Sequence, residues 1–195
     1  WARSRGLGDV YKRQSQLSAS LDLHAKNSSS EINFPESDEM SRYLQEMGKK
    51  YEAKFGEILK AKNLDVFYLN GEISNESYEN TLLTLNKGHD FVSQVFLNSK
   101  KIYGVADYLM KISNKSALGN FSYEPVEIKL ATFEKPSYIL QSIAYCELLS
   151  DVLGKIPENF HLHLGGGKFK TFKTKDYYDW YKNIVDKYEK FLSKF

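Results

Sequence analysis

The clearest strand pattern in the chain is Phe121-Ser-Tyr-Glu-Pro-Val-Glu-Ile-Lys-Leu130. Side chains alternate between the two faces of a strand, so Glu127 and Lys129 share one face while Val126 and Ile128 share the other. An acid and an amine side by side at the edge of an apolar layer suit metal-assisted hydrolysis. Glu127 can bind a hard divalent cation, and Lys129 can orient a water molecule or neutralise charge that develops on a phosphate.

The segments on either side of this strand carry further polar residues. The preceding predicted strand, 102–112, supplies a second acid, Asp107. The helix predicted to follow, from Pro136 to about Leu153, carries Gln141 and Tyr145. These two residues are four positions apart and therefore lie on one face of that helix.

The wider pattern predicts a mixed central β-sheet flanked by helices. A helix is expected from a cap at Ser37 or Asp38 to about Ala61, and a second one from 74 to 87. Strands are expected at 91–97, 102–112, 121–130, 159–164 and 168–173, and Thr174 is expected to cap a last helix. The order ααβββαββα is typical of an α/β or α+β domain, which we place at residues 38–195. Residues 15–37 are serine-rich and are expected to be poorly ordered.

The first fourteen residues are set apart from the fold. In reverse translation, residues 4–14 match a transposase adaptor that is used in building sequencing libraries, so we interpret residues 1–14 as a translated artefact. They hold four basic residues and one acidic residue, and without them the formal net charge changes from +2 to −1. The basic character of the whole chain is therefore no argument for nucleic-acid binding. An adaptor also implies a gene fragment, so we expect the natural protein to differ at both ends.

The composition also limits the class of protein to which this chain can belong. No apolar run approaches the roughly 18–20 residues that a membrane span needs, so no membrane role is expected. A single cysteine, Cys146, excludes an intrachain disulfide and any cluster held by cysteines of this chain alone. It lies in an apolar helical pattern, where a small buried thiol is the expected interpretation. These features favour a reducing, cytoplasmic setting.

The order of these motifs resembles the PD-(D/E)xK nuclease superfamily. Its members place an Asp on the second strand and Glu-x-Lys on the third strand of a restriction-endonuclease-like core. The Gln-x-x-x-Tyr of residues 141–145 is similar to the motif of the RecB-like branch. Three segments resemble RecB-family nucleases more closely: Gly104-Val-Ala-Asp-Tyr-Leu, residues 122–131 and Leu140-Gln-Ser-Ile-Ala-Tyr-Cys-Glu-Leu-Leu. The likeness covers roughly residues 40–194. Any single motif is weak, whereas the order and spacing together are specific.

The resemblance implies roles for individual residues. Asp107 and Glu127 would bind Mg²⁺ or Mn²⁺ with the main-chain carbonyl of Ile128, and Lys129 would be the catalytic lysine. Gln141 and Tyr145 would steady that lysine or contact DNA. On the first helix, Glu52 is the remaining candidate acid.

This chain departs from the family at two places. Tyr51 stands where several relatives have His. Relatives that bind an iron–sulfur cluster use four cysteines, so this chain supports no such cluster.

The implied activity is hydrolysis of DNA phosphodiester bonds, as an exonuclease module of a larger repair or defence protein. A helicase or a second nuclease module is the expected partner in the full-length protein. An alternative function class is a catalytically inactive DNA-binding or scaffold module with the same fold. Glu127 and Lys129 could also be an ion pair on a solvated strand face without a function. Their order in the chain with Asp107, Gln141 and Tyr145 favours the functional interpretation.

Two further patterns leave alternatives open. His161 and His163 alternate on a predicted strand and could both face a metal, although no third ligand is evident nearby. Lysines and aromatic residues also alternate from residue 168 onward, and either contact a nucleic acid or bury their rings with the lysines in solvent. Between these patterns, residues 165–167 lack the Lys-Ser/Thr of a phosphate loop and predict a hairpin turn.

Overall fold

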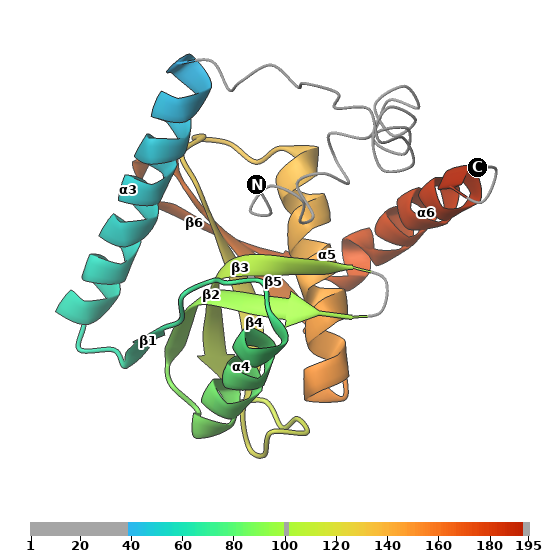
Figure 1. Ribbon diagram of the computed structural model, residues 1–195, viewed down its shortest axis with the longest axis horizontal. Coiled ribbons are helices and arrows are strands. Elements are labelled where there is room, and N and C mark those ends of the chain that lie inside the picture. Colours follow the sequence, from blue (N-terminus) through green and yellow to red (C-terminus); the bar gives the residue numbers. More distant parts are fainter. Residues whose placement is uncertain (1–38, 100–101, 193–195) are drawn as a thin grey trace.

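A six-stranded mixed sheet forms the centre of the computed structural model, which describes residues 39–99 and 102–192 (Figure 1). The helices of these ranges are α3 (Glu39–Ala61), α4 (Asn75–Lys87), α5 (Pro136–Leu153) and α6 (Lys175–Leu192). The strands are β1 (Val66–Tyr68), β2 (Phe91–Asn98), β3 (Tyr103–Ile112), β4 (Ser122–Lys129), β5 (Asn159–Leu164) and β6 (Lys168–Lys173). A single 3₁₀ turn, η2 (Gly165–Gly167), joins β5 to β6. The protein is thus an α+β domain.

The strands lie in the sheet in chain order, β1-β2-β3-β4-β5-β6. The pairs β1–β2 and β4–β5 are parallel, and each is connected through a helix, α4 in the first case and α5 in the second. The other three pairs are antiparallel and have short connections. Parallel neighbours need such crossovers, which explains why helices interrupt the strand series at these two places.

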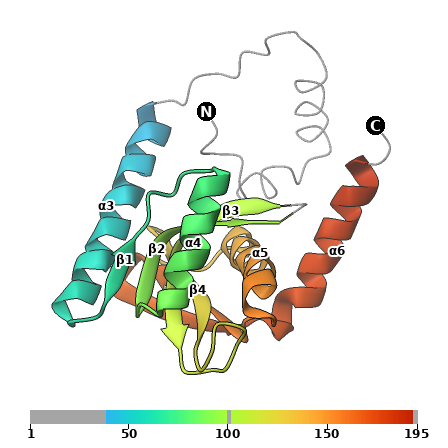
Figure 2. The same ribbon diagram turned by 60° about the horizontal axis from the view of Figure 1, so that its bottom comes forward.

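Helices α3 and α5 cover opposite faces of the sheet, as Figures 1 and 2 show. On the α3 side, Phe55 and Leu59 pack with Val126 and Ile128 of β4. On the α5 side, Tyr123 of β4 lies in the larger cluster with the apolar residues of that helix. The alternation within β4 therefore fixes which of its side chains meets each helix.

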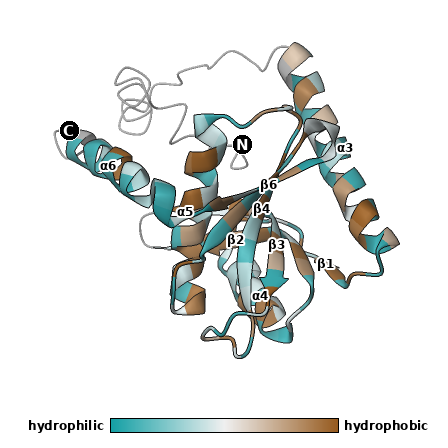
Figure 3. Cartoon of the chain, turned by 180° about the vertical axis from the view of Figure 1, so that it is seen from behind, coloured by the Kyte–Doolittle hydropathy of each residue, from teal (hydrophilic) through white to brown (hydrophobic). Residues whose placement is uncertain are grey.

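Helix α6 contacts the rest of the protein mainly through one side. Tyr181 is almost fully buried, and its hydroxyl donates to a carboxylate oxygen of Glu147 on α5. Lys182 Nζ lies 3.1 Å from the other oxygen of the same carboxylate. The remaining surface of α6 is mostly hydrophilic (Figure 3). Across the described ranges, every helix is too short or too polar to cross a membrane.

The predicted mixed sheet with flanking helices is confirmed, and most predicted elements agree with the observed ones within about two residues. The predicted order ααβββαββα is wrong at one point, because the three-residue strand β1 precedes α4. A run of three residues is too short to show an alternation. The predicted artefact at 1–14, the segment 15–37 and the cap at Ser37 or Asp38 lie outside the described residues. Cys146 is buried, as predicted.

Candidate active site

The site is centred where the backbone pairing of β3 with β4 ends. That pairing runs from Ile112 and Ser122 to Tyr108 and Val126. Beyond this point two carboxylates replace the backbone acceptors. The amide of Ile128 donates to Asp107 Oδ2 at 2.8 Å, and the amide of Asp107 lies 3.4 Å from Glu127 Oε1. The two acids therefore face each other across the opening between the strands.

Lys129 connects these acids to helix α5. Its Nζ lies 2.8 Å from Glu127 Oε2 and 4.0 Å from Asp107 Oδ2. The same ammonium donates to Gln141 Oε1 at 3.1 Å. Gln141 in turn donates to the hydroxyl of Tyr145, and that hydroxyl donates to the carbonyl of Val105 on β3. The structure thus brings the five predicted side chains from β3, β4 and α5 into one hydrogen-bonded cluster.

Burial and like charge set the protonation of this cluster. Glu127 is fully buried, and its burial, with the nearby charge of Asp107, raises its pKa to about 7. Burial alone would lower the pKa of Lys129, but the charges of Glu127 and Asp107 outweigh it and the pKa rises. Lys129 therefore stays cationic at neutral pH. Burial also raises the pKa of Tyr145, which keeps its hydroxyl a hydrogen-bond donor.

Glu52 brings a third carboxylate from α3 toward Asp107. Burial, and after it the charge of Asp107, raises the pKa of Glu52 to about 7. Its Oε1 accepts a hydrogen bond from Gln94 Nε2 at 2.5 Å, and its carbonyl accepts one from Tyr108 at 3.3 Å. The predicted candidate acid of the first helix thus belongs to the same electrostatic environment as the two strand acids.

Gln94 is a site residue that the sequence does not reveal. It lies in β2 between the pairs Ser93–Tyr108 and Val95–Ala106, and therefore opposite Asp107. Its φ of 55° is in the left-handed region, which is rare for a residue with a side chain and costs free energy. The only local signal is a polar residue in an apolar run, which many strands contain.

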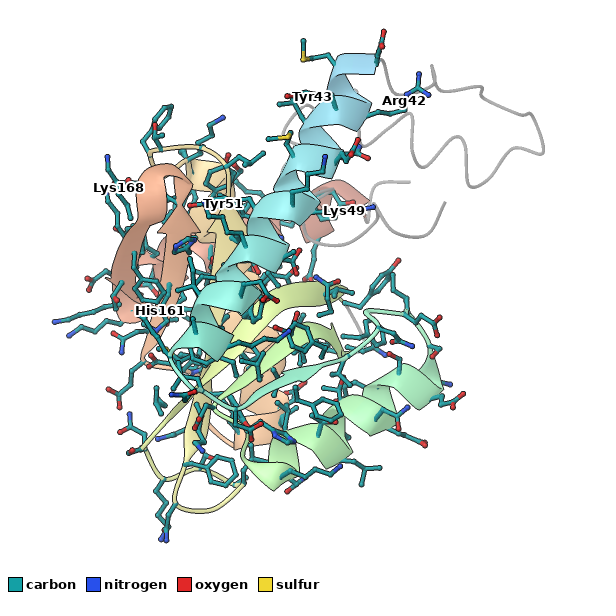
Figure 4. The ribbon with its side chains drawn as sticks, turned by 90° about the vertical axis from the view of Figure 1, so that its left-hand side faces the viewer. Arg42, Tyr43, Lys49, Tyr51, His161 and Lys168 are labelled. Atoms are coloured by element: carbon teal, nitrogen blue, oxygen red, sulfur yellow. The ribbon has the colours of Figure 1, made fainter. Side chains whose placement is uncertain are left out.

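Tyr51 contacts the β5–β6 hairpin. Its hydroxyl donates to the carbonyl of Leu164 at 2.6 Å, and the amide of Gly167 lies 3.4 Å from the oxygen of that hydroxyl. The Tyr51 ring stacks on His163, with centroids 5.4 Å apart. Figure 4 shows Tyr51 on the side of α3 that faces the β5–β6 hairpin. The residue anchors this hairpin and does not reach the three acids.

The two histidines of β5 have different surroundings, and the buried Nδ1 of His163 has no hydrogen-bond partner. His161 Nε2 lies 2.9 Å from Glu124 Oε2, and its Nδ1 lies 2.9 Å from Thr171 Oγ1. His163 packs between Tyr51 and Phe55, and burial lowers its pKa. In residues 39–99 and 102–192, no three or more His, Cys, Asp or Glu side chains are placed to hold a metal ion together.

The alternating lysines and aromatic residues of β6 and α6 could contact a nucleic acid or bury their rings. For the most part the rings are partly buried. Phe172, Tyr177 and Tyr178 pack against the main core. Phe169 is the exception, with 46% of its surface exposed. Most of these rings therefore serve packing.

The two strand acids still fit a hard divalent cation. A strand residue points its N–H and C=O to the same side, so the carbonyl of Ile128 faces the opening together with Asp107 and Glu127. This donor set is entirely oxygen. Mg²⁺ binds few carboxylates and keeps several waters, which substrate oxygens can replace. Two carboxylates and one carbonyl are therefore sufficient protein ligands for this ion.

These contacts define an acidic, partly enclosed centre that contains the ammonium group of Lys129. The arrangement can hold a divalent ion and place a lysine beside whatever that ion binds. No protein-family model matches this chain, and a search of curated protein sequences finds no significant match.

Proposed function

We propose that this chain is a metal-dependent nuclease that hydrolyses DNA phosphodiester bonds. The observation that carries the proposal is the cluster of Asp107, Glu127, Lys129 and Gln141 where β3 and β4 separate. The order of helix, three strands, helix and strand around this cluster supports the resemblance to a RecB-like nuclease with a restriction-endonuclease-like core. Neither net charge nor composition contributes to the argument.

In this proposal Asp107, Glu127 and the carbonyl of Ile128 hold Mg²⁺ or Mn²⁺. The chemistry that such an ion would supply is polarisation of the phosphate and a lower pKa of the attacking water. The protein supplies a rigid arrangement of oxygen ligands, because each acid also binds the backbone amide of the neighbouring strand. Such fixed donors stabilise the developing charge without having to reorganise.

Lys129 places a permanent positive charge beside these oxygens. Its ammonium is held between Glu127 and Gln141, and Tyr145 fixes the Gln141 amide so that its oxygen faces the lysine. The ammonium can donate to a phosphate oxygen or to the attacking water. Gln141 and Tyr145 act through the lysine and are positioning residues.

Glu52 and Gln94 complete the site on the α3 side. Gln94 holds the Glu52 carboxylate near Asp107, where the two negative charges repel each other. A divalent cation at Asp107 would relieve this repulsion and return Glu52 to its ionised form. Glu52 would then be able to accept a hydrogen bond from the attacking water.

The test is a cleavage assay on end-labelled single-stranded and double-stranded DNA with Mg²⁺ or Mn²⁺. The wild-type chain is compared with Asp107→Ala and Lys129→Ala, and with Lys155→Ala as a control for an exposed lysine outside the site. We expect cleavage that needs metal and is lost in the first two variants only. Activity that survives both substitutions, or that is equal in EDTA, contradicts the proposal. DNA binding without cleavage under any condition favours an inactive DNA-binding module.

A further inference from the structure

We propose that the segment 130–135, with Tyr138, is a binding platform for single-stranded DNA, on which an unpaired base stacks beside the candidate active site. This inference rests on the proposed function and adds to it the form of the substrate. The segment starts directly after Lys129 at the end of β4 and ends at the first turn of α5. A strand bound at the cluster would pass over it.

The platform presents an aromatic ring to solvent. Phe133 is 61% exposed and Leu130 is 38% exposed. Single exposed apolar side chains are common on protein surfaces and carry no argument alone. Phe133 differs because the loop around it is fixed while most of the ring is exposed.

Two contacts fix this loop to the β5–β6 hairpin. The amide of Gly165 donates to the carbonyl of Ala131 at 2.8 Å, and a Cβ at Gly165 would lie 2.2 Å from the carbonyl oxygen of Leu130. Only glycine permits this approach. On the other side of Phe133, Glu134 Oε2 lies 2.5 Å from Lys170 Nζ. The ring is therefore held in place by its backbone, which lowers the entropy cost of binding a ligand on it.

A row of alternating cations and rings leads from the cluster to Phe133. Lys129 Nζ lies 5.5 Å from the centroid of the Tyr138 ring, and Lys135 Nζ lies 5.8 Å from the same centroid. Lys135 Nζ is also 5.9 Å from the centroid of the Phe133 ring. A nucleic-acid strand has the complementary pattern, because its phosphates pair with ammonium groups and its bases stack on rings. An apolar peptide would offer no charge to Lys135, the outer lysine of this row.

The exposed ring favours an unpaired base as the ligand. In a duplex the faces of a base are covered by its stacked neighbours, whereas a single strand offers them to aromatic side chains. Stacking on an aromatic residue is tolerant of sequence, so we expect little base preference. A DNA end that is threaded toward Lys129 would thus place a base on Phe133.

The test measures DNA binding separately from cleavage. Fluorescence anisotropy follows a labelled oligothymidylate in EDTA, with wild type, Phe133→Leu and Lys135→Ala. Trp180→Leu serves as a control for an exposed ring on α6, and Lys155→Ala as a control for an exposed lysine. We expect Phe133→Leu to weaken binding about 5- to 50-fold, Lys135→Ala to weaken it as well, and both controls to bind like wild type. An oligonucleotide with abasic positions should lose affinity for wild type and show no further loss with Phe133→Leu.

The outcomes separate the two proposals. Equal affinities of wild type and Phe133→Leu, or an abasic effect that is the same in both, overturn the platform even if the wild type cleaves DNA. Stronger binding of a blunt duplex than of the single strand also overturns it. Loss of binding in Phe133→Leu without cleavage by wild type in Mg²⁺ or Mn²⁺ supports the platform and contradicts the nuclease.

Discussion

Two glutamates on strand β4, Glu124 and Glu127, lie three residues apart and in different surroundings. Glu124 is 3% exposed and Glu127 is fully buried. Each pairs with a base, Glu124 with His161 and Glu127 with Lys129. Both are buried acids with a basic partner, so neither burial nor pairing distinguishes a structural acid from a functional one.

The hydrogen-bond donors around the two carboxylates do distinguish them. Oε1 of Glu124 accepts from the backbone amide and the side-chain amide of Asn159, at 3.1 and 2.9 Å, and Oε2 lies 2.9 Å from His161. Glu127 has one short donor, Lys129 at 2.8 Å, and one long contact of 3.4 Å to the amide of Asp107. It also faces the charge of Asp107. Glu124 has three close donors, while Glu127 keeps more acceptor capacity beside a like charge, which is what our proposal requires of a metal ligand.

The largest expected effect is on catalysis. Glu127→Gln should lower the cleavage rate at least about 100-fold, because the amide is a poor ligand for a hard cation and donates into the lysine. Glu124→Gln is the matched control and should stay within about threefold, since His161 can change tautomer and accept from the new amide. The measurement is the initial rate of DNA cleavage at saturating Mg²⁺. Equal losses in both variants would remove the distinction between the two acids.

Folding stability is expected to depend strongly on the Glu124 carboxylate, which Glu124→Leu removes altogether. Glu124→Leu leaves the amides of Asn159 and the ring of His161 without their acceptor inside the protein. Buried donors without partners cost about 1–3 kcal/mol each, so we expect the free energy of unfolding to fall by about 3 kcal/mol. Urea denaturation followed by circular dichroism measures this change. A loss below about 1 kcal/mol would show that solvent or a tautomer shift compensates for the missing carboxylate.

Much of this fold was predictable because its signals are local. The alternation of Phe121–Leu130 marks a strand, and the Asp, Glu-x-Lys and Gln-x-x-x-Tyr motifs occur in a recognisable order. Regular strands and helices then convert chain order into proximity. This is why Asp107, Glu127, Lys129 and Gln141 could be named together before their contacts were known.

The remaining features depend on contacts between distant segments. Strand β1 has three residues and exists through its parallel pairing with β2. Tyr51 is directed to the hairpin by Leu164, which is 113 residues away in the chain. The left-handed Gln94 lies opposite Asp107 and bonds to Glu52, which is 42 residues away in the chain. None of these contacts leaves a periodic trace in the sequence.

The contrast between the acids should also appear as a pH dependence of stability. The pKa of Glu127 in the folded protein is raised to about 7, so between about 4.5 and 7 the folded state binds more protons than the unfolded chain. Stability in EDTA should therefore fall as the pH rises through this window, by on the order of 3 kcal/mol from Glu127.

Glu127→Gln should remove the part of this slope that Glu127 contributes, whereas Glu52, whose pKa burial also raises to about 7, keeps its own part in both proteins. His163 has a lowered pKa and acts in the opposite direction, but it contributes equally to both proteins and cancels in their difference. Glu124→Gln is again the control. The measurement is the free energy of unfolding at several pH values from 5 to 8, with a repeat in Mg²⁺, which should restore stability near pH 7. A wild-type slope that Glu127→Gln leaves unchanged would assign the titration to another group.

The smallest expected effect concerns Gln94, where stability and function should move in opposite directions. Glycine adopts a φ of 55° without steric cost, so Gln94→Gly should relieve strain and raise the free energy of unfolding by about 0.5–1 kcal/mol. The same change removes the hydrogen bond that holds Glu52 near Asp107. We therefore expect the Mn²⁺ affinity, measured by calorimetry, to fall several-fold.

A second substitution separates strain from the hydrogen bond. Gln94→Asn keeps a side chain that tolerates the left-handed region but is too short to reach Glu52, so it should lose Mn²⁺ affinity with little change in stability. If Gln94→Gly is no more stable than Gln94→Asn, which also lacks the bond to Glu52, relief of the left-handed backbone brings no gain at this position. If both variants bind Mn²⁺ like wild type, Glu52 needs no support from β2, and the acid of α3 is independent of the strand acids. The combination of higher stability with weaker metal binding would mean that the fold tolerates a strained residue for the sake of the site.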